Sequence, residues 1–395
     1  MSALLRPEPR LRIFVPHASD VLTDHLPHGD GLVAYEIVSR LAARGHEVHA
    51  VAPSVALRGR APSTLRAYEI PMRRRSLSAR ARYMMAVRRL YERLARERPF
   101  DVIHQLNPVF AGISLAFAGD PTPVVLGAYV GEWPADAETT DLMGSIRVPF
   151  APALRRAVAT AQQRHASALV VATPAAESLI VERRRHAGKL VRIPHGIDPS
   201  IFRASDAFDE PRDPTILFLG GTERRKGIYT LLDAFALVRR AVPECRLVVG
   251  GAGGRLAAVR AYVADRPEAA SVDFLGPVER RDVPALFRRA TVFCAPSNGE
   301  PFGMSLLEAM ASGKPVVVTD AGGPAHIVER GGGEKVPVGD APALAAALVR
   351  VLESPARRRE MGSFNRRLVE RDYAWDRVID RFEETYAAVA AGVRA

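Results

Sequence analysis

Two series of alternating strand and helix patterns, separated by one irregular segment, constrain the fold of this chain more than any other feature. The first series opens with a buried-strand pattern at residues 11–16, and another strand pattern follows at residues 48–52. Gly45 suits the end of the helix expected between them, whose apolar stripe contains Val33, Ile37, Leu41 and Ala42. A strand, a helix and a second strand in this order predict a parallel sheet.

The irregular segment and the second series predict another domain of the same class. Residues 189–214 are rich in Pro, Asp and Ser and have no sustained period, which is typical of a linker. Beyond them the strand and helix patterns start again, and a length of 395 residues fits about two domains. We expect two Rossmann-like, doubly wound α/β domains that bind ligands in a cleft at the carboxyl ends of their strands, with residues 1–195, a linker at 196–213 and residues 214–374.

The composition narrows the classes of partner. The formal charge of +11 would suit an anionic partner, but only four of the 55 basic residues are lysines. Such an excess of arginine suggests a compositional bias of the source genome, so we expect no nucleic-acid partner. No apolar run reaches the roughly 18 residues of a membrane span, and the first residues lack a secretory signal pattern. We expect a cytoplasmic protein, monomeric or homodimeric, in which Cys245 and Cys294 are buried free thiols.

Two glycine-rich segments require separate interpretations. Residues 250–256 lack the third glycine of a dinucleotide-binding fingerprint, because Leu256 stands there. Residues 220–227, GGTERRKG, carry the lysine before the glycine and so do not form a Walker P-loop. This segment joins a strand to a helix, where Lys226, Arg224 and Arg225 could form a cation cluster for a phosphate. A solvated polar loop explains the same residues equally well.

The segment EPFGMSLLE, residues 300–308, also has two interpretations. Ser305 and Glu308 have the spacing of a capping box, in which Ser305 is the N-cap of a helix. In the alternative, amides at the start of that helix accept a diphosphate, Glu308 binds a vicinal diol and Glu300 faces the cleft. The segment by itself does not distinguish these interpretations.

The order of several motifs resolves this choice. Along its length the chain resembles glycosyltransferase family 4, the retaining nucleotide-sugar transferases of the GT-B fold. The family signature is a pair of glutamates separated by seven residues, here Glu300 and Glu308. Supporting stretches in the family's order are HGDG, IPHGID, ILFLGG with RKG, LVVGGAG, VDFLGPV, GKPVVVTDAGGPAHIV and a C-terminal helix at about 375–395 that returns to the first domain.

The resemblance implies a role for each matching residue. Lys226 would neutralise charge on the leaving phosphate, and Glu300 would contact the transferred sugar, so these two residues are the expected catalytic pair. Glu308 would bind the ribose hydroxyls of the nucleotide. The other expected donor-binding residues are Gly29, Gly31, Arg225, Phe302, Gly303, Met304 and Ser305. The resemblance implies no metal ion and no cofactor besides the nucleotide sugar, which is a co-substrate.

Two positions depart from the family pattern. Many relatives have an arginine where this chain has Gly221, and a His-x-His pair where it has His104 and Leu106. His104 is therefore either a sugar or acceptor contact or a packed strand residue. Asn107 could take over part of the missing histidine's work, and a polar loop that contains Glu132 is expected to shape the acceptor pocket.

The acceptor itself is not encoded in a motif. We expect a hydroxyl of a small molecule, such as a specialised metabolite or a cell-envelope precursor. A basic amphipathic helix at residues 77–97, with Leu77, Ala81, Met84, Leu90 and Leu94 near one face, would instead suit a lipid acceptor at the inner face of an anionic membrane. A third hypothesis, prompted by Gly221 and Leu106, is a non-catalytic protein that only binds nucleotide sugars.

Overall fold

The structure is a computed structural model of the chain. It describes residues 10–26, 29–72, 76–106, 112–130, 151–203, 213–251, 253–328 and 331–392.

The first domain is built on a parallel sheet with the strand order β5-β3-β1-β6-β7-β8-β9. The predicted strand–helix–strand unit forms as β1 (Arg12–Val15), α1 (Gly29–Ala43) and β3 (Glu47–Ala52). Gly45 follows α1 with a φ of 98°, a left-handed conformation that suits glycine at the end of a helix. The other strands are β5 (Leu65–Glu69), β6 (Val102–Gln105), β7 (Val124–Tyr129), β8 (Ala168–Val171) and β9 (Leu190–Arg192). A separate pair of short strands, β2 (Val21–Thr23) and β4 (Ser54–Ala56), lies beside this sheet.

The second domain repeats the architecture with the strand order β12-β11-β10-β13-β14-β15. Its strands are β10 (Thr215–Leu219), β11 (Arg246–Gly250), β12 (Val272–Gly276), β13 (Val292–Ala295), β14 (Val316–Thr319) and β15 (Gly333–Val336). Its helices are α4 (Ile228–Ala241), α5 (Leu256–Val263), α6 (Val283–Arg289), α7 (Met304–Ala311), α8 (Gly322–Ile327) and α9 (Ala341–Leu352). All neighbouring strands of both sheets run parallel, and each domain has the order of a Rossmann sheet, as predicted. Both cysteines are buried free thiols.

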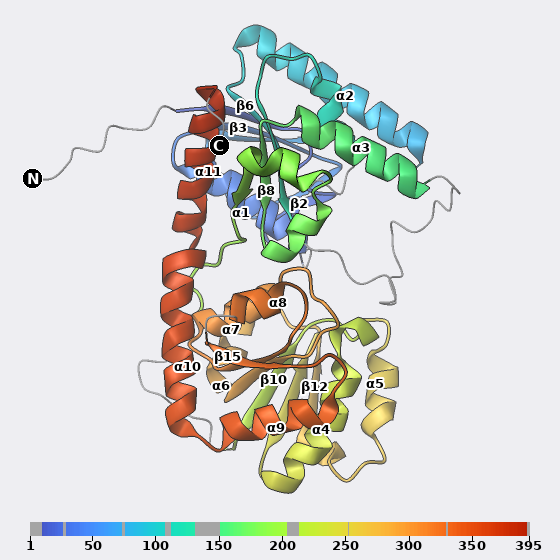
Figure 1. Ribbon diagram of the computed structural model, residues 1–395, viewed down its shortest axis with the longest axis vertical. Coiled ribbons are helices and arrows are strands. Elements are labelled where there is room, and N and C mark those ends of the chain that lie inside the picture. Colours follow the sequence, from blue (N-terminus) through green and yellow to red (C-terminus); the bar gives the residue numbers. More distant parts are fainter. Residues whose placement is uncertain are drawn as a thin grey trace, which may run out of the picture.

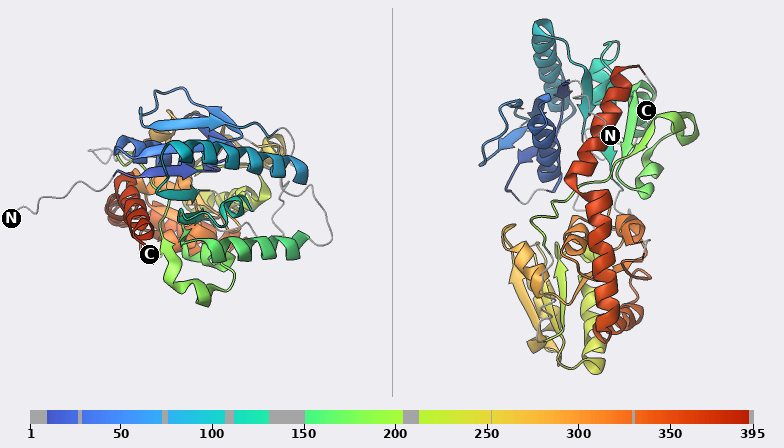
Figure 2. Two further views of the ribbon diagram at one scale, coloured as in Figure 1. Left: turned by 90° about the horizontal axis from the view of Figure 1, so that it is seen from above. Right: turned by 90° about the vertical axis from the view of Figure 1, so that its left-hand side faces the viewer.

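The two domains lie one above the other, and the C-terminal helices run along one side of both (Figures 1 and 2). Helix α10 (Pro355–Leu368) lies beside the second domain, and α11 (Trp375–Ala390) returns to the first, as predicted. Arg44 donates to Asp380 and to Glu383 at 2.6 Å each, and Tyr386 is fully buried in the first domain. Helix α11 is therefore part of the first domain's structure.

The chain crosses between the domains through a closely packed segment. Ile197 forms a parallel bridge with Ala374, just before α11 begins. Gly196 lies directly against the ring of Trp375, and a Cβ atom at Gly196 would stand 2.4 Å from ring atoms. Ile197 and Phe202 are each 1% exposed. The first part of the predicted linker is therefore packed, because the returning helix covers it.

Helix α2 (Leu77–Glu97) matches the predicted boundaries, but its predicted apolar face is partly wrong. Ala81 is exposed and Met84 only partly buried. Leu90 and Leu94 are buried in the core as predicted, together with Tyr83, Val87 and Tyr91, which the prediction did not include. The tyrosines were missed because their apolar rings pack in the core while their hydroxyls keep hydrogen-bond partners.

The chain after β8 forms a 3-10 helix, η2 (Pro174–Leu179), which is followed by a second one, η3 (Arg183–Lys189). No helix of the described residues is long and apolar enough to cross a membrane.

Replacing Gly196 by alanine tests the packing at the crossing. The new methyl group would collide with the Trp375 ring, so we expect the free energy of unfolding to fall by about 1–3 kcal/mol. Urea titration followed by circular dichroism measures this change. Gly188→Ala is the matched control, because a Cβ there meets nothing within 4 Å. Equal losses in both variants would contradict the assigned contact.

Candidate active site

The two expected catalytic residues lie in contact at the carboxyl ends of adjacent strands. Strands β10 and β13 pair in the second sheet, and the loops after them carry Lys226 and Glu300 respectively. The Lys226 ammonium lies 2.5 Å from a Glu300 carboxylate oxygen. The side chain of Lys226 is 24% exposed and that of Glu300 is 20% exposed. The pair is thus formed by the fold and open to a ligand.

The turn before α4 needs a glycine to present Lys226. Residues Arg224–Lys226 form a single 3-10 turn, and Gly227 follows it with a φ of 74°. A Cβ atom on Gly227 would stand 1.8 Å from the carbonyl oxygen of Pro296. The amide of Asn298 also donates to the carbonyl of Arg225 at 2.8 Å. These backbone contacts join the Lys226 turn (residues 220–227) to the Glu300 loop (residues 296–303).

The Glu300 loop is also closely packed on its other side. The amide of Gly323 donates to the carbonyl of Glu300 at 2.8 Å, and a Cβ on Gly322 would stand 2.3 Å from the same oxygen. The AGGP segment at residues 321–324 therefore packs against the backbone of the Glu300 loop. This close packing explains why Gly322 and Gly323 are glycines, which the sequence alone did not explain.

The capping-box interpretation of Ser305 and Glu308 is wrong. Helix α7 begins at Met304, and its N-cap is Gly303 with a φ of 101° and no side-chain cap. Ser305 and Glu308 are therefore both inside the helix, where Ser305 lies in the first turn and Glu308 in the second. The first amides of a helix have no partner within it, so those of Met304 and Ser305 point toward the Glu300 loop with the positive end of the helix dipole.

Glu308 occupies a buried position beside one guanidinium. Its side chain is 13% exposed, and Arg280 approaches a carboxylate oxygen to 3.9 Å. Burial raises the pKa of the Glu308 carboxyl to about 7, and the positive charge of Arg280 opposes this rise. Arg280 was not identified from the sequence, although it is the second residue after the VDFLGPV stretch.

The first domain contributes the start of α1 and a small pocket at its base. Gly29 begins the helix in an exposed position, and Gly31 is buried. The pocket has a volume of about 50 Å³ and is lined by Ala18, Asp30, Val33, Ala34, Ile37, Leu106, Ala128, Val130 and His195. The ring of His195 packs on Phe302 of the Glu300 loop, with 4.6 Å between ring centroids. His195 thus connects this pocket with the second domain.

His104 lies in the core of the first domain. It is fully buried, its Nδ1 lies 2.6 Å from the Tyr386 hydroxyl, and its Nε2 lies 2.5 Å from the Gly127 carbonyl. Burial lowers the pKa of its imidazole to about 4. This geometry favours the packed-residue alternative, in which His104 joins two strands to α11. Asn107 and Glu132 lie outside the described residues.

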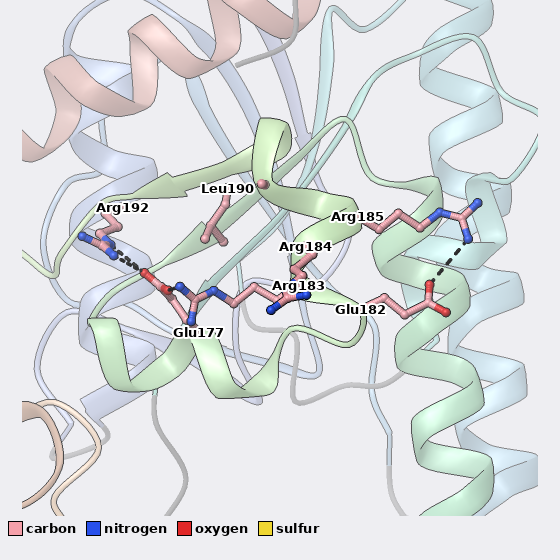
Figure 3. Close-up of a pocket in the computed structure, with 8 residues that line it drawn as sticks. Glu177, Glu182, Arg183, Arg184, Arg185, Leu190 and Arg192 are labelled. Carbon is pink, nitrogen blue, oxygen red and sulfur yellow. Dashed lines mark hydrogen bonds and ion pairs between the residues drawn. The ribbon is translucent and has the colours of Figure 1, made fainter.

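A second hollow, of about 1,080 Å³, lies on the first domain around η2, η3 and β9 (Figure 3). Two glutamates pair with three of its four arginines. Glu177, whose side chain is 3% exposed, accepts a hydrogen bond from Arg192 at 2.7 Å and pairs with Arg183 at 2.9 Å. Glu182 pairs with Arg185 at 3.7 Å. These pairs hold η2 and β9 together, and we interpret the cluster as structural.

The fold and the paired loops define a class of protein. Two Rossmann-like domains with a C-terminal helix that returns to the first are the GT-B architecture of glycosyltransferases. The family described as "Glycosyltransferase Family 4" matches residues 28–201, and the one described as "Glycosyl transferases group 1" matches residues 202–368. The chain belongs to glycosyltransferase family 4, and it is a hexosyltransferase that uses a nucleotide sugar.

Similar proteins agree with this assignment. The chain is 28% identical to a phosphatidyl-myo-inositol mannosyltransferase of Mycobacterium leprae, over 96% of this chain and 97% of that protein. A glycogen synthase of Mycobacterium tuberculosis is 29% identical over 45% of this chain and 44% of its own length. Among solved structures, Anabaena HepE in complex with UDP and glucose has a TM-score of 0.70 at 18% identity, covering 96% of this chain and 100% of that one. A glycosyltransferase from Rickettsia africae has a TM-score of 0.74 at 14% identity, covering 97% and 99%.

The raised pKa of Glu308 predicts a pH-dependent stability. The folded-state pKa of about 7 lies above the ordinary value of 4.5, so the free energy of unfolding falls as pH rises from about 4.5 to 7 and is level above. Glu308→Gln removes this loss, and at pH 8 we expect it to be more stable than the wild type by about 1–3 kcal/mol. At pH 4.5 the two proteins should be nearly equal.

Urea titration at both pH values measures the difference. Glu384→Gln changes an exposed glutamate and is the control. A Glu308→Gln effect of the same size at both pH values would show that the ionisation of Glu308 is not its cause.

Proposed function

We propose that the enzyme transfers a hexosyl group to a hydroxyl of a small-molecule acceptor, with retention of the anomeric configuration and without a metal ion. The observation that carries this proposal is the contact between Lys226 and Glu300, 2.5 Å apart beside the start of α7. The pair places one cation and one carboxylate where a sugar diphosphate would meet the first amides of a helix.

The chemistry follows the charge that develops during transfer. As the bond between the anomeric carbon and the phosphate oxygen breaks, its electron pair goes to the diphosphate. The Lys226 ammonium and the amides of Met304 and Ser305 stabilise that negative charge because they are held in position beforehand. The acceptor oxygen bonds to the anomeric carbon on the face that the diphosphate leaves, and the acceptor's proton passes to the leaving phosphate oxygen.

Glu300 has two functions in this proposal. In the absence of a ligand its carboxylate holds the Lys226 ammonium at the carboxyl ends of the strands. With the donor present, one of its oxygens accepts a hydrogen bond from a sugar hydroxyl and so orients the ring. Orientation of this kind supplies a large share of catalysis, because the acceptor oxygen must be held close to the anomeric carbon on the face that the diphosphate leaves.

Glu308 would bind the ribose of the nucleotide. Its carboxyl lies one helical turn beyond the amides that meet the diphosphate, and Arg280 lies beside it. A carboxylate can accept hydrogen bonds from two neighbouring hydroxyls at once. Gly29 and Gly31 would approach the donor from the first domain. A larger residue at either position would keep the backbone further from the donor.

Loss of either member of the catalytic pair should abolish most of the turnover. We expect Lys226→Ala and Glu300→Gln each to lower kcat by about 10²–10³, because each removes one interaction made with the transition state. The donor is first identified by thermal shift with a panel of nucleotides and nucleotide sugars, and turnover is then measured as release of the nucleoside diphosphate. Lys335→Ala, an exposed lysine of the same domain, is the control.

Two results would refute this proposal. Unchanged turnover in both variants would exclude the assigned catalytic roles. Stabilisation by nucleotide sugars with no turnover under any acceptor condition would favour the non-catalytic alternative.

A lipid acceptor is the second candidate, and one comparison favours it. The Mycobacterium leprae relative, whose name describes a phosphatidyl-myo-inositol mannosyltransferase, matches 96% of this chain. Helix α2 buries its apolar face in the first domain, so it can offer a membrane only its arginine side. Contact with an anionic bilayer would then be electrostatic and sensitive to salt.

Co-sedimentation with vesicles of phosphatidylglycerol and phosphatidylcholine tests this candidate. If the acceptor is a lipid, the protein should bind at low salt and leave the vesicles at about 0.5 M salt. The double variant Arg82→Glu and Arg89→Glu on the exposed side of α2 should lose the binding. Arg359→Glu with Arg367→Glu, exposed on α10, changes the net charge equally and is the control. Failure to bind at low salt would count against a lipid acceptor.

A further inference from the structure

The IPHGID stretch was part of the family resemblance but received no function from it. Its histidine, His195, lies after β9 in the segment that crosses between the domains. Ile193 and Ile197, on either side, are 0% and 1% exposed, and Gly196 lies under Trp375. His195 is therefore held at a defined place between the domains.

His195 has a buried ring nitrogen that the surrounding structure leaves unsatisfied. Its Nδ1 is inaccessible to solvent and finds no hydrogen-bond partner among the described residues. Buried polar atoms are nearly always hydrogen-bonded, so such an atom in a pocket suggests a ligand. Burial also lowers the pKa of the imidazole to about 4, so the ring is neutral at pH 7.

The pocket beside His195 lies where an α/β sheet is expected to bind a ligand. It is bounded by residues that follow β1, β6 and β7 and by the start of α1. In the strand order of this sheet the connections reverse direction between β1 and β6, and ligands bind in the crevice outside such a switch point. The pocket thus has an expected position as well as an unsatisfied polar atom.

The shape and lining of this pocket limit what it can hold. About 50 Å³ admits one small group, since a single water needs roughly 10–15 Å³ of accessible space. Seven of its nine lining residues are apolar, including Leu106, Ala128 and Val130, and the two polar ones are Asp30 and His195. A hydroxyl enclosed by the apolar residues would lose its hydrogen bonds to water, and the pocket would not replace all of them.

Contact with the second domain indicates which substrate supplies the group. The His195 ring packs on Phe302, which is 4% exposed and lies between Glu300 and Gly303. The His195 ring therefore lies between the pocket and the Glu300 loop, which would hold the transferred sugar. In a hexose the carbon outside the ring projects furthest and is the group that can reach such a pocket.

We propose that this pocket binds the exocyclic carbon of the transferred sugar and favours a sugar without a hydroxyl on that carbon, while His195 Nδ1 bonds a neighbouring ring hydroxyl. The preferred donor is then a nucleotide-linked 6-deoxyhexose. Leu106 determines this specificity, and His195 is a donor-binding residue. The inference rests on the proposed function, since it assigns a sugar class to the same site.

Equilibrium binding of matched donor pairs tests the inference. UDP-glucose is compared with UDP-6-deoxyglucose, GDP-mannose with GDP-6-deoxymannose, and UDP and GDP alone are measured beside them by calorimetry. We expect the 6-deoxy member to bind about 10- to 100-fold more tightly in the pair whose nucleotide is accepted, the range for one group in an apolar pocket.

Variants separate the two residues. Leu106→Asn should reduce the preference to within about threefold, because the amide offers the hydroxyl a partner. His195→Phe keeps a ring against Phe302 and should weaken both members of the pair about tenfold, with the free nucleotide unaffected. Leu154→Asn, at an exposed leucine of α3 (Ala151–His165), is the matched control and should keep the wild-type ratio. Melting curves establish that each variant is folded, and His195→Phe carries the test if Leu106→Asn is not.

The outcomes distinguish this inference from the proposed function. Equal binding of both members of a pair, or an unchanged ratio in Leu106→Asn, would overturn the inference and leave the proposed function intact. If no nucleotide and no nucleotide sugar binds, the proposed function itself fails.

Discussion

The packing of Trp375 on Gly196 determines where the two domains of this enzyme meet. At this point the chain crosses from the first domain to the second, and the C-terminal helices cross back beside it. Ile197 also forms backbone hydrogen bonds with Tyr373 and Trp375, the residues on either side of Ala374. Two segments of the chain are therefore bonded together where they cross, which restricts rotation of one domain against the other. His195, one residue away, is thereby placed against Phe302, and the pocket of the first domain comes to face the Glu300 loop.

Close backbone contacts then bring together Lys226 and Glu300, the proposed catalytic pair. Lys226 and Glu300 are 74 residues apart in the chain, and they meet because β10 and β13 are neighbours in a parallel sheet. Glycines allow the loops after these strands to approach within contact distance, since a Cβ on Gly227 or Gly322 would overlap a carbonyl oxygen. The first amides of α7 lie beside the pair. The positive potential at this site therefore comes from the backbone amides of α7 as well as from the Lys226 ammonium.

Much of this architecture could be predicted from the sequence. The central strands of both sheets carry short apolar runs that are typical of strands buried on both faces, and the predicted strands at 11–16 and 48–52 are present as β1 and β3. Edge strands such as β5 and β15 were missed, because their mixed polar pattern resembles that of a loop. The capping box was wrong for a related reason. A serine three residues before a glutamate fits both a cap and a helix interior, and the positive φ of Gly303 decides the start of α7.

The sequence by itself determined the fold class and the family, and it singled out the two residues that we propose as the catalytic pair, because periodicity and ordered motifs are local properties of the chain. Only the tertiary structure decided the environment of each side chain. His104 is enclosed by β7 and α11, which are distant in sequence, and Glu308 is buried beside Arg280. Burial and partners of this kind depend on long-range packing, so the pKa of a carboxyl or the unsatisfied nitrogen of His195 becomes visible only when the chain has folded.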